Sequence, residues 1–573
     1  MRRPWPALVA CILAACGSKD PPAASSVLIT LDTTRADALG AFGGTAATPA
    51  LDRLATRGVI FERALTVAPL TLPAHASMLT GLYPPRHGIR DNGFAPLPQS
   101  AHTVAEKARA AGFQTAAFVA AVVLEPTFAL DQGFDVFDAP QALETPSTHI
   151  GHRSGDEVIA NALEWLHHRK AGQPFFLWVH LFEPHAPYTA PDDLLEAHDG
   201  NAYLAEVALL DRFLAPLLKE LEELEDPTSL LVVADHGEGL GEHREETHGY
   251  FLYQATLSVP MVLVRSDGAR AAERSPAVVS VVDVAPTLCA AMGLVSENDI
   301  DGVSLFEGDP EATRGVYFES YAGHLSFGWT PIAGWADARG KYIHSSSPEF
   351  YETLSDPGEQ NNLMDSHPDV EDYLRSLAQL GELQSLPSEK STQTAPELMD
   401  QIRALGYAST GASVEELPKP LDENEGPNPH DSSLELQRTL MAADIYNQGR
   451  IEPALRLIDS ILRKNPGNLR SLEMRINCLL LLQRNAEAIE PLQEYLRRTP
   501  GRAIDHFNLA VCLHGEGRAE DAIESYRRAL QGESNRPAWL PDFLRLLRSQ
   551  GLAEEARRWN RRFSAPSGSS SGN

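Results

Sequence analysis

Short apolar runs that end abruptly in polar residues alternate with longer stretches in which apolar residues recur every three or four positions. The short runs are 27–31, 115–119, 175–180, 230–234 and 259–264. The stretches with a helical period include 155–170 and 203–224. Buried strands that alternate with amphipathic helices predict an α/β fold, with a largely parallel sheet covered by helices on both faces. Polar side chains that follow such strands lie where ligands bind in these folds.

A second pattern begins near residue 432. Small residues recur there every 34 positions, at Ala454, Ala488, Ala522 and Ala556. A fixed small residue allows two helices to approach closely, so residues 432–563 predict an all-α solenoid of about three full repeats and a partial one. The period resembles that of tetratricopeptide repeats, which implies a groove for a protein or peptide partner. The alternative is a scaffold that packs on the preceding domain.

The segments between and beyond these regions have the composition of linkers. Residues 381–431 are rich in Pro, Ser, Thr, Glu and Asn, and residues 564–573 are rich in Ser and Gly. Such segments bury too little apolar surface to fold alone, so we expect a linker and a disordered tail. The remaining region, residues 26–380, is expected to be one catalytic domain.

The first residues have the pattern of an export signal. Two Arg precede an apolar run that ends in Leu-Ala-Ala-Cys16. Residues 1–16 therefore predict a lipoprotein-type signal peptide with a lipid anchor on Cys16, a linker at 17–25 and a place in the cell envelope or periplasm. A plain secretory signal is the alternative. The apolar run is shorter than the roughly 20 residues of a membrane-spanning helix.

Charge is distributed unevenly along the chain. The formal net charge is −30, and residues before 431 hold 27 Lys and Arg against 60 Asp and Glu. A strongly acidic catalytic region disfavours nucleic acid as a partner and does not steer polyanions over long distances. An anionic substrate group must therefore be bound by local side chains. Besides Cys11 and Cys16 the chain has only three cysteines, so no disulfide framework is expected.

The segment 71–81, TLPAHASMLTG, resembles the sulfatase signature C/S-x-P-S/A-R-x-x-L/M-L-T-G. Thr71 stands where sulfatases have the Cys or Ser that is oxidised to formylglycine, and His75 stands in place of Arg. Segments 27–43 and 230–243 look like the two metal-binding strands of the sulfatase and alkaline-phosphatase superfamily. Segments 281–293 and 343–365 resemble later family elements, which implies a small C-terminal subdomain at about 300–380.

The resemblance implies a divalent metal bound by Asp32, Asp235, His236 and the Thr71 oxygen. Carboxylates with one imidazole suit Mn²⁺, Mg²⁺, Zn²⁺ or Ca²⁺. Thr33 replaces a second Asp of many sulfatases, which makes Ca²⁺ the less favoured ion.

Further histidines are expected at the rim of the site. By resemblance, His185 contacts the anionic group and His248 protonates the leaving group or binds its oxygen. His75 either binds the anion as a weaker donor than Arg or only supports its helix. His180 is expected to be a buried strand residue or a further rim residue, and His243 a surface residue.

Thr71 bears on the reaction. Thr cannot become formylglycine by the known route, and a sulfate ester of Thr would be cleared slowly by water. A phosphorylated Thr can be cleared by in-line attack of water or an acceptor hydroxyl. The sequence therefore predicts a metal-dependent hydrolase or transferase of sulfate or phosphate esters, with phosphoryl or phosphonyl substrates favoured. One alternative is a formal sulfuric ester hydrolase, and another is an inactive binding module whose repeats recruit partners.

Overall fold

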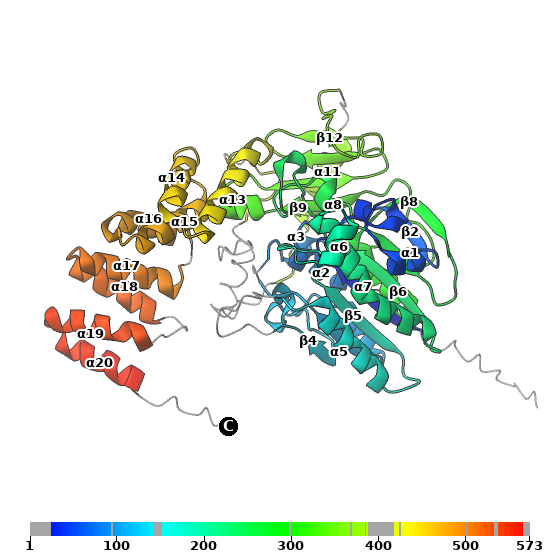
Figure 1. Cartoon of the computed structure of the whole chain (residues 1–573), viewed down its shortest axis with the longest axis horizontal. Helices are drawn as coiled ribbons and strands as arrows, with labels where there is room; N and C mark the ends of the chain where they lie inside the picture. Colours follow the sequence, from blue (N-terminus) through cyan, green and yellow to red (C-terminus); the bar gives the residue numbers. More distant parts are fainter. Residues whose placement is uncertain are drawn as a thin grey trace, which may run out of the picture.

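The computed structural model describes residues 24–92, 95–140, 152–296, 299–366, 370–383, 385–387, 417–422, 426–499, 501–531 and 537–564. The predicted signal peptide with Cys16, most of the predicted linker at 381–431 and nearly all of the predicted tail lie outside these residues. Within them the chain forms an α/β unit followed by a curved array of helices (Figure 1). No helix in the described part of the chain is long and apolar enough to cross a membrane.

An eight-stranded sheet forms the centre of the α/β unit. In order across the sheet, its strands are β4 (Val136–Asp138), β3 (Gln114–Val119), β5 (Phe175–Leu181), β1 (Ser25–Leu31), β6 (Thr228–Ala234), β7 (Met261–Val264), β2 (Val59–Leu65) and β8 (Glu273–Ser280). Among the pairings of these described strands, the two of β7 are antiparallel and the others are parallel. The five predicted runs all form strands, and the predicted α/β class is confirmed. The sequence pattern did not predict β2, β4 and β8.

Helices cover the sheet on both faces, so every residue of the central strands β1 and β5 is buried. The helices α5 (Gly155–His168), α7 (Ala202–Glu223) and α1 (Pro49–Ala55) form one packed group. The helices α2 (Thr71–Thr80), α4 (Val104–Ala110) and α9 (Val284–Ala291) form another. The predicted helical stretches at 155–170 and 203–224 correspond to α5 and α7.

A smaller antiparallel sheet follows, as the predicted subdomain requires. Its strands are β12 (Glu349–Tyr351), β11 (Lys341–His344), β10 (Ile332–Ala336) and β9 (Val316–Ser320), in that order. The helices α10 (Ala322–Phe327) and α11 (Glu371–Glu382) accompany it. Glu319 of β9 forms a buried ion pair with Arg90, which ties this subdomain to the segment that follows α2.

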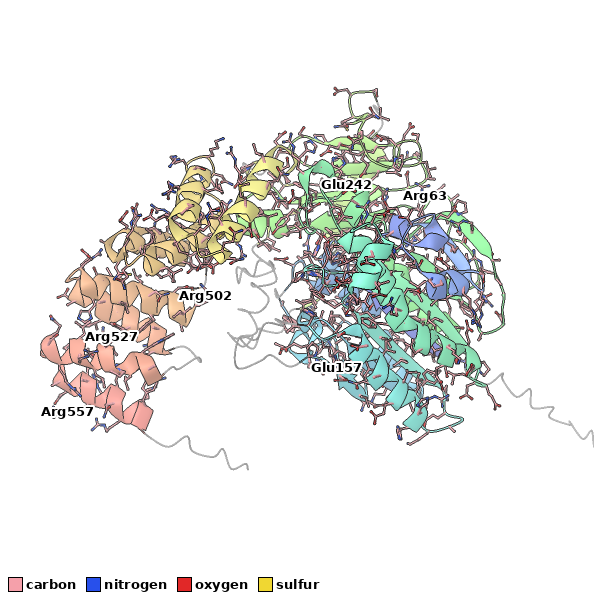
Figure 2. All side chains as sticks on the ribbon, viewed as in Figure 1. Arg63, Glu157, Glu242, Arg502, Arg527 and Arg557 are labelled. Carbon is pink, nitrogen blue, oxygen red and sulfur yellow. The ribbon has the colours of Figure 1, made fainter. Side chains whose placement is uncertain are left out.

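In the described part of the C-terminal array, the helices form four consecutive pairs. They are α13 (Ser433–Asn447) with α14 (Ile451–Leu462), α15 (Leu469–Leu481) with α16 (Asn485–Arg498), α17 (Ala503–Gly515) with α18 (Ala519–Gln531), and α19 (Leu540–Ser549) with α20 (Ala553–Ser564). The alanines of the 34-residue period are fully or almost fully buried, as close helix approach requires. In Figure 2, Arg502 and Arg527 mark the pair of α17 and α18, and Arg557 marks α20 in the last pair.

Candidate functional site

The predicted metal ligands lie side by side at the carboxyl ends of two neighbouring strands. β1 and β6 pair in parallel, with Leu31 opposite Ala234, so the next residues, Asp32 and Asp235, are adjacent. The sheet ladder continues through both of them, because the Asp32 amide donates to Leu181 and the Asp235 amide donates to Leu31. The backbone at both carboxyl groups is thus held by the hydrogen bonds of the sheet.

Asp32, Asp235 and His236 form a compact group of potential metal ligands. His236 Nε2 lies 3.6 Å from Asp32 Oδ1 and 3.6 Å from Asp235 Oδ2. All three side chains are fully buried, and neither oxygen of Asp32 has a hydrogen-bond partner among the described residues. Asp235 Oδ2 likewise has no hydrogen-bond partner among the described residues. Burial raises the pKa of both carboxyl groups, and the charge of Asp32 raises that of Asp235 further.

Two buried carboxyl groups with orphaned oxygens are unfavourable unless a cation joins them. His236, the third potential ligand, is also suited to bind a cation. Its Nδ1 donates to the Gly237 carbonyl over 2.9 Å, which leaves the Nε2 lone pair directed at the carboxylates. The residues present therefore fit a divalent metal ion.

The backbone at Thr33 supports the Asp235 carboxylate. Thr33 has φ = 45°, an uncommon conformation for a β-branched residue. Its amide donates to Asp235 Oδ1 over 3.3 Å, and the Tyr203 hydroxyl donates to its carbonyl over 2.8 Å. The second Oδ1 contact comes from the His236 amide at 2.7 Å. Asp235 Oδ1 is thus held by the backbone, and Oδ2 is left for the metal.

Thr71 is the first residue of α2 and faces the same group. Its Oγ1 lies 3.4 Å from His236 Nε2, and the residue is fully buried. The amide of Leu72, in the first turn of α2, donates to the side-chain oxygen of Asn92 over 2.8 Å. A hydroxyl, two carboxylates and an imidazole therefore meet at the start of a helix, where backbone amides favour anions.

His75 lies one turn further along α2, and both of its ring nitrogens contact protein atoms. Nδ1 donates to the Thr71 carbonyl over 2.8 Å, so the neutral ring accepts at Nε2, from the Thr30 hydroxyl at 3.0 Å. The Trp178 indole in turn donates to Thr30 over 3.0 Å. Burial lowers the pKa of His75 well below its ordinary value. These contacts favour the second predicted role, support of the helix, over direct contact with an anion.

His180 completes a second group of donor atoms with His75 and Asp235. Its Nδ1 faces the amide of Ala120 at 3.4 Å, and its Nε2 lies 3.6 Å from Asp32 Oδ2. An imidazole that accepts at Nδ1 carries its proton at Nε2, where it points at the carboxylate rather than offering a lone pair to a metal. His180 is a buried strand residue whose Nε2 lies beside Asp32 without a hydrogen bond to it.

His185 and His248 lie next to the metal-ligand group. Their ring centres are 5.2 Å apart, and the ring of His248 is 4.4 Å from that of His236. His248 Nδ1 donates to Glu238 Oε1 over 3.0 Å. Burial lowers the pKa of His248, but the charges of Glu238 and Asp32 outweigh it and raise the pKa above its ordinary value. Burial lowers the pKa of His185 to about 3. One imidazole is thus suited to hold a proton and the other to remain neutral.

The sequence did not single out Glu238 and Asn92. The Asn92 amide nitrogen is fully buried and has no hydrogen-bond partner in the described part of the chain, so it can donate to a bound anion. Asn92 belongs to a short polar segment that a turn would explain equally well.

His243 does not join the site: its ring stacks on Tyr253 at 3.6 Å, and its Nε2 contacts the Gly358 carbonyl.

Comparisons with known proteins agree with this geometry. Residues 25–294 match the family model described as Sulfatase, and residues 441–503 match that of the tetratricopeptide repeat. The α/β unit is a sulfatase-family domain, followed by tetratricopeptide repeats. The family match, together with sulfatase and phosphonate monoester hydrolase relatives, supports an ester hydrolase. Its sequence is 24% identical over 414 residues to an uncharacterized sulfatase, YidJ, of Escherichia coli K12, covering 59% of this chain and 82% of that protein.

Further relatives are similar to this chain in sequence or in structure. An ulvan-active sulfatase of Formosa agariphila is 24% identical over 68% of this chain and 84% of its own length. The structure of a phosphonate monoester hydrolase of Agrobacterium radiobacter superposes with a TM-score of 0.51 at 22% identity, covering 62% of this chain and 95% of that one. A putative sulfatase of Bacteroides fragilis gives a TM-score of 0.52 at 19% identity, covering 63% and 95%. At these identities the likeness of the structures concerns the fold alone.

Proposed function

We propose that the sulfatase-family domain is a metal-dependent hydrolase or transferase of phosphodiesters or phosphonate monoesters, with Thr71 as nucleophile. The observation that carries the proposal is the position of Thr71: an unmodified hydroxyl at the start of α2, 3.4 Å from His236 Nε2 and beside the orphaned carboxylates. The phosphonate monoester hydrolase among the structural relatives supports it. The many sulfatases among the sequence relatives support the second candidate, a sulfuric ester hydrolase.

The site suits a group with a single negative charge. His75 stands in place of Arg, and burial keeps it neutral, so the first turn of α2 carries no fixed positive charge. The local donors are the Asn92 amide and His248. A divalent ion held by Asp32, Asp235 and His236 would offset charge on the substrate oxygens and favour ionisation of the Thr71 hydroxyl. A diester or a phosphonate monoester is a monoanion, whereas a phosphomonoester carries up to two charges.

The chain's own residues account for the remaining proton movements. Thr71 Oγ1 forms a bond to phosphorus as the bond to the leaving oxygen breaks, and that oxygen takes a proton from His248. Glu238 holds the His248 ring and stabilises its charged form. In the second step water or an acceptor hydroxyl attacks phosphorus, gives its proton to the now neutral His248 and releases Thr71. Asn92 and His185 flank the anion.

The test is parallel hydrolysis of aryl sulfate, aryl phosphate, bis-aryl phosphate and aryl phosphonate by the metal-loaded chain. We expect the diester or the phosphonate to be preferred. Thr71→Ala should abolish turnover but keep the bound metal, since three protein ligands remain, and Thr71→Ser should retain measurable activity. Acid quenching during turnover should trap a phosphoryl or phosphonyl group on the peptide that contains Thr71. Preference for aryl sulfate would favour the second candidate, and turnover by Thr71→Ala would refute the nucleophile.

We also propose that the chain is exported and anchored through Cys16 to a membrane of the cell envelope. The support is the sequence of residues 1–16 alone. Labelling with radioactive palmitate should mark the wild-type protein, and Cys16→Ala should abolish the label and release the protein from the membrane fraction. A Cys16→Ala protein that stays in the membrane fraction would contradict the anchor.

A further inference from the structure

A cavity of about 400 Å³ lies between the edge of the large sheet and the small C-terminal subdomain. Leu65 of β2 and Val278 of β8 line one side of it, and Ala336 of β10 lines another. Arg63 and Glu242, which also line the cavity, are labelled in Figure 2. No potential metal ligand of the candidate site lines it. Its volume is typical of a site for a small molecule, so the cavity is a separate candidate site.

The acidic side chains of this cavity already have cationic partners. Asp37 and Glu242 pair with Arg35, Glu62 pairs with Arg274, and Glu359 pairs with Lys341. A carboxylate that is paired in this way does not require a cation from a bound ligand. The acidic side chains therefore do not determine what the cavity binds, and the remaining cation and the uncharged polar groups do.

Arg63 is the remaining cation. It is half-buried in β2, and its Nη2 donates to the Asp337 carbonyl over 2.9 Å. The Asp337 carboxylate is bound by Arg339 at 2.7 Å, and no carboxylate of a described residue forms an ion pair with Arg63. Its Nε and Nη1 make no hydrogen bond with a described residue either. A half-buried guanidinium group with unused donors is suited to bind a carboxylate through two parallel hydrogen bonds.

Two uncharged polar side chains of the same cavity come from the turn α8 (Gln254–Leu257) and the residue that follows it. Gln254 Oε1 is buried and has no hydrogen-bond partner among the described residues. The backbone of this turn is held in place, because the Gln254 amide donates to Glu359 over 2.6 Å and the Ser258 amide donates to the Gln254 carbonyl over 2.9 Å. A buried acceptor without a donor is costly, and a hydroxyl group of a ligand would satisfy it.

We propose that this cavity is a second ligand site, for a small hydroxylated carboxylate whose carboxylate binds Arg63 and whose hydroxyl group donates to Gln254. A single negative charge is favoured over the two charges of a phosphate, because the paired acidic groups surround the one unpaired cation. The site shares a wall with the segment that carries His248, since Arg35 Nη1 donates to the Glu238 carbonyl over 3.2 Å. The proposal does not depend on which ester the catalytic site cleaves.

Calorimetry on the full metal-loaded chain tests this site. Lactate, glycerate and gluconate are compared with their amides, which keep the hydroxyl groups and lack the charge. We expect the best acid to bind the wild type about 10-fold more tightly than its amide, because a charge-assisted hydrogen bond is lost in the amide. Arg63→Ala should abolish that preference, and Arg63→Lys should keep part of it. The control Arg53→Ala, which replaces an exposed arginine of α1, should leave it unchanged.

A second variant tests the hydroxyl contact. The best acid is compared with its analogue that lacks the hydroxyl group next to the carboxylate, such as propionate for lactate. We expect the hydroxyl group to strengthen binding to the wild type and to give no advantage in Gln254→Leu, which should still prefer the acid to its amide. The side chain of Gln254 makes no hydrogen bond with a described residue, so this variant tests the site even if Arg63→Ala does not fold. Thermal unfolding checks the fold of each variant.

Three results would overturn the inference. One is a preference for the acid that persists in Arg63→Ala, which would place the acid at the metal-ligand group instead. Another is the absence of binding by every acid, and the third is tighter binding of inorganic phosphate than of the acids. A preference that depends on Arg63 supports the site whether or not the chain hydrolyses phosphorus esters.

Discussion

Replacement of Leu436 by alanine should weaken the attachment of the repeats to the catalytic unit. The side chain of Leu436 is 0% exposed and packs in the cluster of Phe251, Tyr253 and Trp329. Three buried carbons are removed, which forfeits roughly 2.4 kcal/mol of transfer free energy at about 0.8 kcal/mol each. A cavity between two domains that cannot collapse adds to this cost, so we expect the free energy of unfolding to fall by about 3–4 kcal/mol.

The matched control lies two residues away on the same helix. Leu434 is 46% exposed, so Leu434→Ala should cost less than about 1 kcal/mol. Both variants are unfolded in urea and followed by circular dichroism and by tryptophan fluorescence. Hydrogen exchange is read for the peptide that contains Phe251. We expect faster exchange there in Leu436→Ala only. Equal free energies of unfolding for the two variants, or unchanged exchange at Phe251, would refute the view that α13 supports this segment.

Three further changes test a buried histidine of the fold, the partner of His248 and a glycine of the backbone. Burial lowers the pKa of His87 to about 3, so below about pH 6.5 the unfolded chain binds a proton on this residue that the folded chain does not. His87 should therefore contribute a loss of about 1.4 kcal/mol of stability per pH unit as the pH drops from 6 to 4, and urea titrations of His87→Gln should lack that contribution. Glu238→Gln should lower kcat by about 10- to 100-fold, because it removes the charge that holds His248, with metal content unchanged by elemental analysis. Gly249 has φ = +103°, so Gly249→Ala should destabilise the fold by about 1–3 kcal/mol in thermal unfolding, whereas Gly515→Ala, in helix α17, should not.

The parts of the site that the sequence revealed are those that follow buried strands. Asp32 and Asp235 each end an apolar run, and two parallel strands bring such ends to the same edge of a sheet. The start of α2 at Thr71 agrees with the signature segment. Local pattern was sufficient in these places because the fold positions each residue through its own strand or helix.

The features that the sequence missed depend on contacts between distant segments. The strand β2 was not predicted because Glu62 and Arg63 interrupt its apolar run. Its partner strand β8 lies more than 200 residues further along the chain. The role of Asn92 depends on the amide of Leu72, and that of His75 on Thr30. The sequence offers the repeats as a groove or as a scaffold, and Glu435 alone could not show that they attach at Trp329 of the preceding domain.

In the described part of the chain, the first two helix pairs contact the catalytic unit, while α17 to α20 pack on one another further along the chain. In such an array each pair depends mainly on its neighbours. Helix pairs inserted or lost beyond α16 would change the length of the C-terminal array and leave the catalytic unit as it is. The length of this array can therefore change, in evolution or by engineering, to suit the size of a bound partner independently of the chemistry.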